Sequence, residues 1–109
     1  MKSQPAFINR KIQAAYEELD AGKAIEKELH KNLESAFRDI AENAFCGIQI
    51  PKRLIPKDYL KRYGIDNLWK YNLPDAWRLL YTIRRDQVIV ITIILEWMPH
   101  KEYEKKFKY

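Results

Sequence analysis

The fold is decided by the stretch LWKYNLPDAWRLLYTIRRDQVIVITIILEW, residues 68–97. Three runs within it are rich in aromatic and β-branched residues: Leu68–Leu73, Trp77–Arg85 and Ile89–Trp97. Such residues favour strands, whereas Pro74-Asp75-Ala76 and the polar residues around Asp86-Gln87 are typical of connections. The stretch therefore predicts three consecutive antiparallel strands.

Alternation of side chains divides these strands between two faces, and a slip of one residue would exchange the faces. We pair Leu73 with Trp77 and Arg85 with Ile89, which puts Arg78 opposite Glu96 and Thr82 opposite Thr92. The apolar face then holds Trp69, Tyr71, Leu73, Trp77, Leu79, Tyr81, Ile83, Ile89, Ile91, Ile93, Leu95 and Trp97. The other face is mixed, with Lys70, Asn72, Arg78, Thr82, Arg84, Thr92 and Glu96 beside Leu80, Val90 and Ile94. We expect the mixed face to stay open as a candidate site. A plain Arg78–Glu96 ion pair is the alternative.

Apolar residues upstream of the predicted sheet recur with the spacing of helices. Apolar side chains recur at Ile8, Ile12, Ala15, Tyr16 and Leu19, and after Gly22 at Ile25, Leu29, Leu33, Ala36, Phe37, Ile40 and Ala44. Gly47–Ile50 resembles a short strand, and Lys57–Tyr63 a helical turn that Gly64 ends. The sequence thus predicts one domain, residues 1–109, of the α+β class, with two N-terminal helices packed on one face of a small antiparallel sheet.

Composition narrows the possible partners. The net charge is +5, with a sequence pI of about 9.3, which favours polyanions such as nucleic acid, a ribosome or an acidic protein. The single cysteine, Cys46, excludes an intramolecular disulfide and a thiolate zinc site. Val88–Leu95 is the longest apolar run, too short to span a bilayer, and Met1–Pro5 lacks the apolar run of a signal peptide. We expect a cytoplasmic protein with no membrane partner, no metal and no cofactor.

The second strand and the segment after the third resemble the RelE/ParE toxin superfamily. Trp77-Arg78-Leu79-Leu80-Tyr81 is similar to its Tyr/Trp-Arg-x-x-Tyr strand, and His100-Lys101-Glu102-Tyr103-Glu104-Lys105 to the His-x-x-Tyr-Asp-Lys ending of HigB-type members. The resemblance implies a toxin of a type II toxin–antitoxin module, with a cognate antitoxin as partner. RelE-like and HigB-like branches cleave mRNA, often on the ribosome and without a metal, whereas ParE-like branches poison DNA gyrase.

The resemblance assigns catalytic roles to Arg78, His100 and Tyr103. A guanidinium suits phosphate oxygens, an imidazole titrates near neutral pH, and a tyrosine can stack on a base or assist proton transfer. Phosphate contacts are expected from Lys52, Arg53, Lys57, Lys70 and Arg84. Two departures weaken the match: Pro99 precedes His100, and no later strand arginine corresponds to the one that some RelE proteins use.

Two other functions stay open. One is a non-catalytic or diverged member of the fold, either a ParE-like gyrase inhibitor or an orphan module that only binds RNA or protein. The other is an α+β domain whose likeness to toxins is superficial, in which His100 is a surface residue, Tyr103 packs against the sheet edge and Lys101–Lys108 is a solvated tail.

Overall fold

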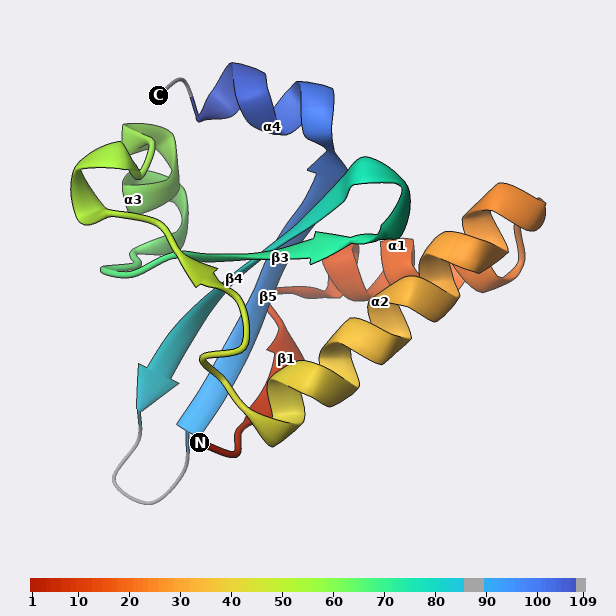
Figure 1. Ribbon diagram of the computed structural model, residues 1–109, viewed down its shortest axis with the longest axis horizontal. Helices are drawn as coiled ribbons and strands as arrows, with labels where there is room; N and C mark the ends of the chain where they lie inside the picture. Colours follow the sequence, from red (N-terminus) through yellow and green to blue (C-terminus); the bar gives the residue numbers. More distant parts are fainter. Residues whose placement is uncertain (86–89, 108–109) are drawn as a thin grey trace.

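A mixed sheet of five strands lies at the centre of the residues that the structure, a computed structural model, describes: 1–85 and 90–107. Across the sheet the strands are ordered β1 (Gln4–Phe7), β5 (Val90–Pro99), β4 (Trp77–Arg85), β3 (Trp69–Leu73) and β2 (Ile48–Gln49). β1 is parallel to β5, and the other neighbouring strands are antiparallel (Figure 1). The three predicted strands and the short one near Gly47 are confirmed. β1 was not predicted.

The helix pair covers one face of the sheet, as the sequence predicts. The Asn9 side chain accepts a hydrogen bond from the amide of Ile12 and so caps α1 (Arg10–Asp20). α2 (Ala24–Glu42) buries Leu29, Leu33, Ala36 and Ile40 against sheet residues that include Leu79, Tyr81 and Ile94. The predicted stripe on α2 is therefore confirmed at these four positions. Ile25, at its start, is 77% exposed.

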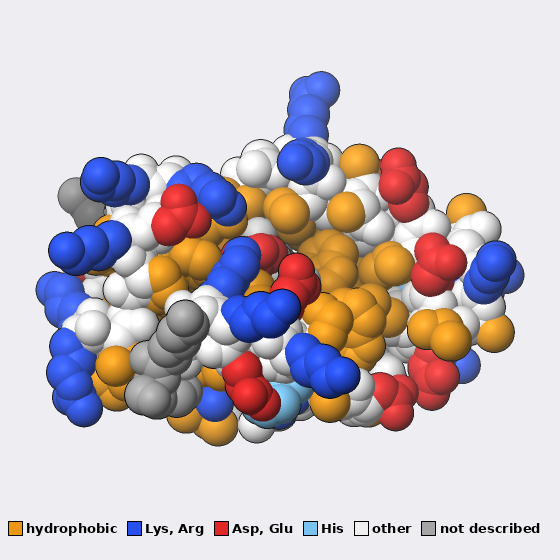
Figure 2. Space-filling view, turned by 90° about the horizontal axis from the view of Figure 1, so that it is seen from above, with side chains coloured by type: hydrophobic (Ala, Val, Ile, Leu, Met, Phe, Trp, Pro, Cys, Tyr) orange, Lys and Arg blue, Asp and Glu red, His pale blue; other side chains and the backbone are white. Residues whose placement is uncertain are grey.

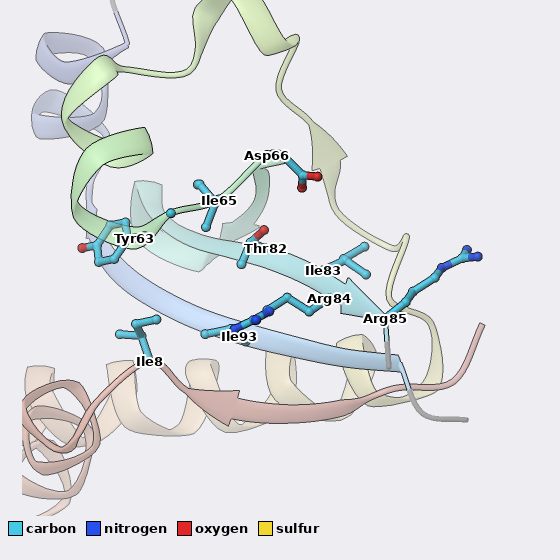
Figure 3. A pocket seen from close by; sticks show the side chains of 10 residues that line it. Ile8, Tyr63, Ile65, Asp66, Thr82, Ile83, Arg84, Arg85 and Ile93 are labelled. Carbon is cyan, nitrogen blue, oxygen red and sulfur yellow. The ribbon is translucent and has the colours of Figure 1, made fainter. Parts of the chain in front are cut away.

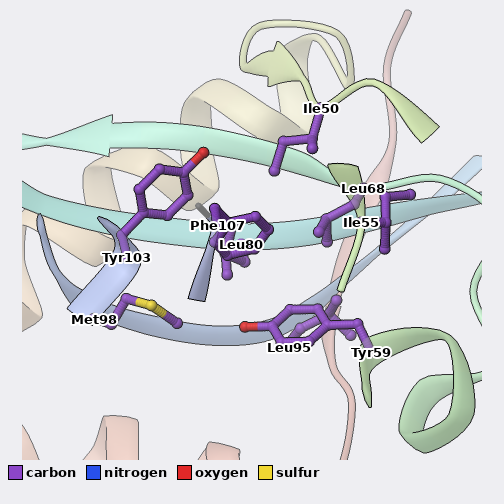
Figure 4. Packing of buried hydrophobic residues seen from close by; sticks show 9 residues of the cluster. All are labelled: Ile50, Ile55, Tyr59, Leu68, Leu80, Leu95, Met98, Tyr103 and Phe107. Atoms are coloured by element: carbon purple, nitrogen blue, oxygen red, sulfur yellow. The ribbon is translucent and has the colours of Figure 1, made fainter. Parts of the chain in front are cut away.

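The opposite face is covered as well, so the prediction that it stays open is wrong for its middle. The short 3-10 helix η1 (Lys52–Leu54), α3 (Lys57–Tyr63) and α4 (His100–Lys106) pack there. Figure 4 shows their shared core, in which Tyr59, Tyr103 and Phe107 lie over Leu80, Leu95 and Met98. α3 ends at Gly64, whose φ of 62° is left-handed, as predicted. No helix in the described residues combines the length and apolar content that crossing a bilayer needs.

The predicted register between β4 and β5 is wrong: it is shifted by one residue from Arg85 to Tyr81 and by two residues beyond a β-bulge in β5. Arg84 lies opposite Ile91 and Thr82 opposite Ile93, whereas beyond the bulge Leu80 lies opposite Glu96 and Arg78 opposite Met98. The extra residue, Leu95, lets Ile94 point into the helix-pair core and Leu95 into the opposite core. The predicted faces therefore hold for β3 and β4 but are exchanged in β5 from Val90 to Leu95, and the bulge restores them at Glu96 and Trp97. The predicted pairing of Arg85 with Ile89 is also wrong, because Arg85 lies opposite Val90.

The link between β3 and β4 has unusual backbone geometry. The 3-10 turn η2 (Pro74–Ala76) joins the two strands in the predicted position, with Asp75 at φ 59° and Ala76 at φ 61°. It fixes the pairing of Leu73 with Trp77, and with it that of Asn72 with Arg78 and Lys70 with Leu80. The predicted register of this hairpin is confirmed, and it determines where the cations of the site lie.

Candidate nucleic-acid interface

Lys70 and Arg78 come from neighbouring strands and share the face that carries α4. Arg78 lies two residues before Leu80 on β4, so both side chains point to the same face. Leu80 packs in the core beneath Tyr103. The guanidinium of Arg78 is half-buried and its Nη1 donates a hydrogen bond to the carbonyl of Trp77 at 3.0 Å. It forms no ion pair with an acidic side chain in the described part of the chain. Its charge is therefore available to an anion from outside.

Lys70 is held against the ring of a buried tyrosine. Its Nζ lies 4.9 Å from the centre of the Tyr103 ring, within range of a cation–π interaction. Burial lowers the pKa of Lys70 below its ordinary 10.5, and repulsion from Arg78 lowers it further. Lys70 and Arg78 lie diagonally across the β3–β4 pair, where like charges repel each other. An anion placed between them would relieve that repulsion, which is the electrostatic property expected of a phosphate site.

α4 places His100 and Tyr103 next to each other, but it buries Tyr103. The two rings are nearly parallel with centres 6.4 Å apart, and Phe107 stacks on Tyr103 at 4.5 Å. Only 2% of Tyr103 is exposed (Figure 4). Its ring is therefore closed to a nucleobase in this conformation. The base-stacking role is incompatible with this placement, and the ring instead supports Lys70.

His100 stays at the surface, with its side chain 42% exposed. Its Nε2 is paired with the carboxylate of Glu104, one helical turn further along α4. Its Nδ1 is buried and has no hydrogen-bond partner among the described residues. Glu104 orients the ring, and a substrate that uses Nε2 must displace this carboxylate.

Glu96 does not compete for Arg78, so the predicted Arg78–Glu96 ion pair is wrong. The bulge moves Glu96 opposite Leu80, where its carboxylate accepts a hydrogen bond from the Tyr59 hydroxyl. Lys106 Nζ lies 3.5 Å from the same carboxylate. Burial and this hydrogen bond raise the pKa of Tyr59 well above its ordinary range. Glu96 therefore ties α3, β5 and α4 together and leaves the guanidinium without a carboxylate neighbour.

The remaining predicted cations do not gather at Lys70 and Arg78. Lys52, Arg53 and Lys57 are exposed on η1 and α3, in the same layer as α4. Figure 2, seen from the α4 end, shows Lys and Arg side chains gathered on its left, with others nearer the middle beside an apolar hollow. Arg84 is six residues from Arg78, about 20 Å along the strand. It belongs to a separate cavity.

Sequence reasoning missed Lys106 and Tyr59 because it predicted no helix after the last strand and assigned no partner to Lys57–Tyr63. The signal was present, since His100, Tyr103 and Phe107 have the spacing of one helical face. Within residues 1–85 and 90–107, no group of three His, Cys, Asp or Glu side chains gathers in a way that could hold a metal ion.

Comparisons of the chain with protein-family models, with curated proteins and with solved structures found no match. The α+β architecture is shown by the structure itself, whereas membership of the RelE/ParE superfamily stays a hypothesis. What the chain does is therefore inferred from the geometry of the site.

Proposed function

We propose that this chain is a RelE-like toxin of a type II toxin–antitoxin module, a metal-independent endoribonuclease that cleaves mRNA on the ribosome. The observation that carries the proposal is the placement of Lys70 and Arg78. They lie together on the face away from the helix pair, without a described carboxylate partner, and Lys70 contacts Tyr103, whose ring lies beside that of His100 on α4. The helix pair followed by antiparallel strands also supports it. A cytoplasmic location, with a cognate antitoxin, the ribosome and mRNA as partners, follows from this class.

The site residues suit cleavage by the 2′-hydroxyl of the RNA itself. That oxygen attacks the adjacent phosphorus, and the bond to the 5′-oxygen of the next nucleotide breaks, which leaves a cyclic phosphate. Arg78 and Lys70 stabilise the extra negative charge on the phosphorane. His100 transfers a proton, either from the attacking hydroxyl or to the leaving oxygen, once RNA has displaced Glu104 from Nε2. Tyr103 acts through Lys70, which it holds in position.

A non-catalytic module of the same fold is the second candidate, either a ParE-like gyrase inhibitor or an orphan that binds RNA or protein. Two observations favour it. Tyr103 is buried, and the exposed nitrogen of His100 is already paired with Glu104. An anion site built from Lys70 and Arg78 serves binding as well as catalysis.

The test is cleavage of ribosome-bound reporter mRNA by the purified protein, compared among Arg78→Ala, His100→Gln and the control Arg38→Ala. Arg38 is an equally charged residue on α2, which packs on the other face of the sheet from α4, and it is paired with Glu34. Arg78→Ala should slow cleavage about 100-fold or more, because it removes a group that stabilises the transition-state charge. His100→Gln should also slow it, and Arg38→Ala should not.

The two candidates give different results in this assay. If the wild-type protein leaves mRNA intact but binds RNA in a manner that Arg78→Ala abolishes, the non-catalytic module is correct. Inhibition of gyrase supercoiling by the wild-type protein would identify the ParE-like alternative.

A further inference from the structure

A cavity of about 390 Å³ lies at the end of β4 and β5 remote from Arg78, on the same face of the sheet. Its walls are the half-buried side chains of Ile8, Tyr63, Ile65 and Ile93, and Arg84 and Asp66 supply charges of opposite sign. Figure 3 shows Arg84 extended among these walls, over Ile93. We call this cavity the Arg84 pocket. Its volume is in the range of pockets that bind small organic groups.

Asn67 fixes one side of the Arg84 pocket to β4. Its Oδ1 accepts a hydrogen bond from the amide of Ile83, and its Nδ2 donates to the carbonyl of Ile83, both at 2.9 Å. The hydroxyl of Thr82 donates to the Asn67 carbonyl at 2.7 Å. Nδ2 of Asn67 also donates to the carboxylate of Asp66 at 2.8 Å, which holds this carboxylate beside the cavity. The polar edge of the pocket is therefore built in advance of any ligand.

Arg84 has no hydrogen bond or ion pair to any other described residue, although Asp66 lines the same cavity. Arg85 provides a direct contrast. Its guanidinium points to the other side of β4, where Nη2 lies 3.8 Å from Met1 Sδ, and Figure 3 shows it directed away from the pocket. Both arginines are exposed and line the cavity, but the guanidinium of Arg84 extends over its apolar wall, whereas that of Arg85 reaches Met1.

Tyr63 supplies a supported aromatic wall. Its ring meets Tyr59 edge to face at 5.4 Å, and the guanidinium of Arg62 lies 5.6 Å from its centre. A ring held in this way, together with three isoleucines, suits a flat heterocycle. Arg84 suits a phosphate, and a carboxylate such as Asp66 accepts hydrogen bonds from an exocyclic amino group.

We propose that the Arg84 pocket receives one unpaired base of a single-stranded RNA, with the base beside Tyr63, its phosphate on Arg84 and its amino group on Asp66. Cytosine, adenine and guanine carry such an amino group, and uracil does not. The pocket therefore prefers amino-bearing bases. This inference rests on the proposed function for RNA as the ligand, but it does not require cleavage.

The experiment measures binding of the full chain to fluorescently labelled oligocytidylate and oligouridylate of equal length. Arg84→Ala should weaken oligocytidylate binding about tenfold, whereas Arg85→Ala, which removes the same charge one residue away, should have a much smaller effect. Asp66→Asn should reduce the preference for oligocytidylate over oligouridylate. Ile65→Trp should fill the pocket and weaken both. Thermal unfolding of each variant checks that it is folded.

The outcomes separate this inference from the proposed function. If Arg84→Ala and Arg85→Ala weaken oligocytidylate binding equally, the attraction is independent of the pocket. The proposed base-binding role of the pocket would then be wrong, even if the protein cleaves mRNA. Equal affinity of the wild-type protein for the two oligonucleotides would overturn the preference for amino-bearing bases. If mRNA stays intact while only Arg84→Ala weakens oligocytidylate binding, the pocket stands and the ribonuclease proposal fails.

Discussion

Lys70 Nζ lies 4.9 Å from the centre of the Tyr103 ring, so a buried aromatic residue of α4 supports a cation of β3. Replacing both residues in a double-mutant cycle, Lys70→Met with Tyr103→Leu, should give a coupling of about 0.5–1 kcal/mol in the free energy of unfolding. Urea denaturation measures it. Phe107→Leu is the control, because Phe107 stacks on Tyr103 but its ring is not the one beneath Lys70. Coupling of Lys70 to Phe107 as strong as to Tyr103 would contradict the cation–π contact.

Arg78 contributes to the lowered pKa of Lys70, but burial contributes more. Arg78→Met should therefore raise the pKa of Lys70 and still leave it below 10.5. NMR titration of the lysine side chain measures this value. Since the folded pKa is depressed, the charged lysine destabilises the fold below that pKa, and the cost disappears as the pH rises towards 10.5. A Lys70 pKa unchanged by Arg78→Met would show that the two cations are not neighbours.

The hydrogen bond from Tyr59 to Glu96 lies in the core between α3 and β5. Tyr59→Phe should reduce the free energy of unfolding by about 1–3 kcal/mol, because it leaves a partly buried carboxylate with one partner fewer. Chemical denaturation measures the loss. Tyr16→Phe is the matched control, since the hydroxyl of Tyr16 forms no hydrogen bond to a described residue, and it should change stability much less. If Tyr59→Phe and Tyr16→Phe reduce the free energy of unfolding equally, the loss comes from removing any tyrosine hydroxyl and not from the hydrogen bond to Glu96.

Tyr71 should make the fold sensitive to alkali. Burial raises its pKa to about 12, and a hydrogen bond to Asp39 contributes to the shift. The unfolded tyrosine loses its proton first, near pH 10, so stability is complete below that pH and falls as the pH rises towards 12. Ultraviolet titration measures the ionisation. Asp39→Asn should lower the pKa of Tyr71 while leaving it above 10, and Tyr71→Phe should flatten the decline in stability. If Tyr71→Phe leaves the decline in stability above pH 10 unchanged, that decline comes from other tyrosines with raised pKa values, such as Tyr81.

The sequence predicted the elements that depend on local pattern. Trp77–Arg85 is a strand over the residues expected, and Lys57–Tyr63 is a helix that ends at Gly64. Lys70 and Arg78 were placed on one face because the turn after Leu73 fixes the pairing of β3 with β4. The predicted roles of Arg78, His100 and the basic residues in RNA binding or cleavage stay predictions.

The wrong predictions concern features that depend on contacts between distant parts of the chain. Leu95 is an apolar residue in an apolar strand, so nothing local marks it as a bulge. Two cores, one on each side of the sheet, select that geometry. β1 has only four residues and contains Pro5, which is tolerated because the strand lies at the edge of the sheet. The burial of Tyr103 depends in the same way on α3, which supplies Tyr59 to the core.

The pairing of β1 with β5 has a consequence for the time at which the site forms. β1 comes near the start of the chain, whereas its partner is the last strand, so about 85 residues of synthesis separate the two. A nascent chain can form the α1–α2 hairpin early, but it cannot close the sheet or dock α4 until β5 has left the ribosome. Lys70 and Arg78 therefore acquire their final surroundings only after β5 and α4 have been synthesised. A chain that acts on mRNA would gain its site only once those later elements were in place.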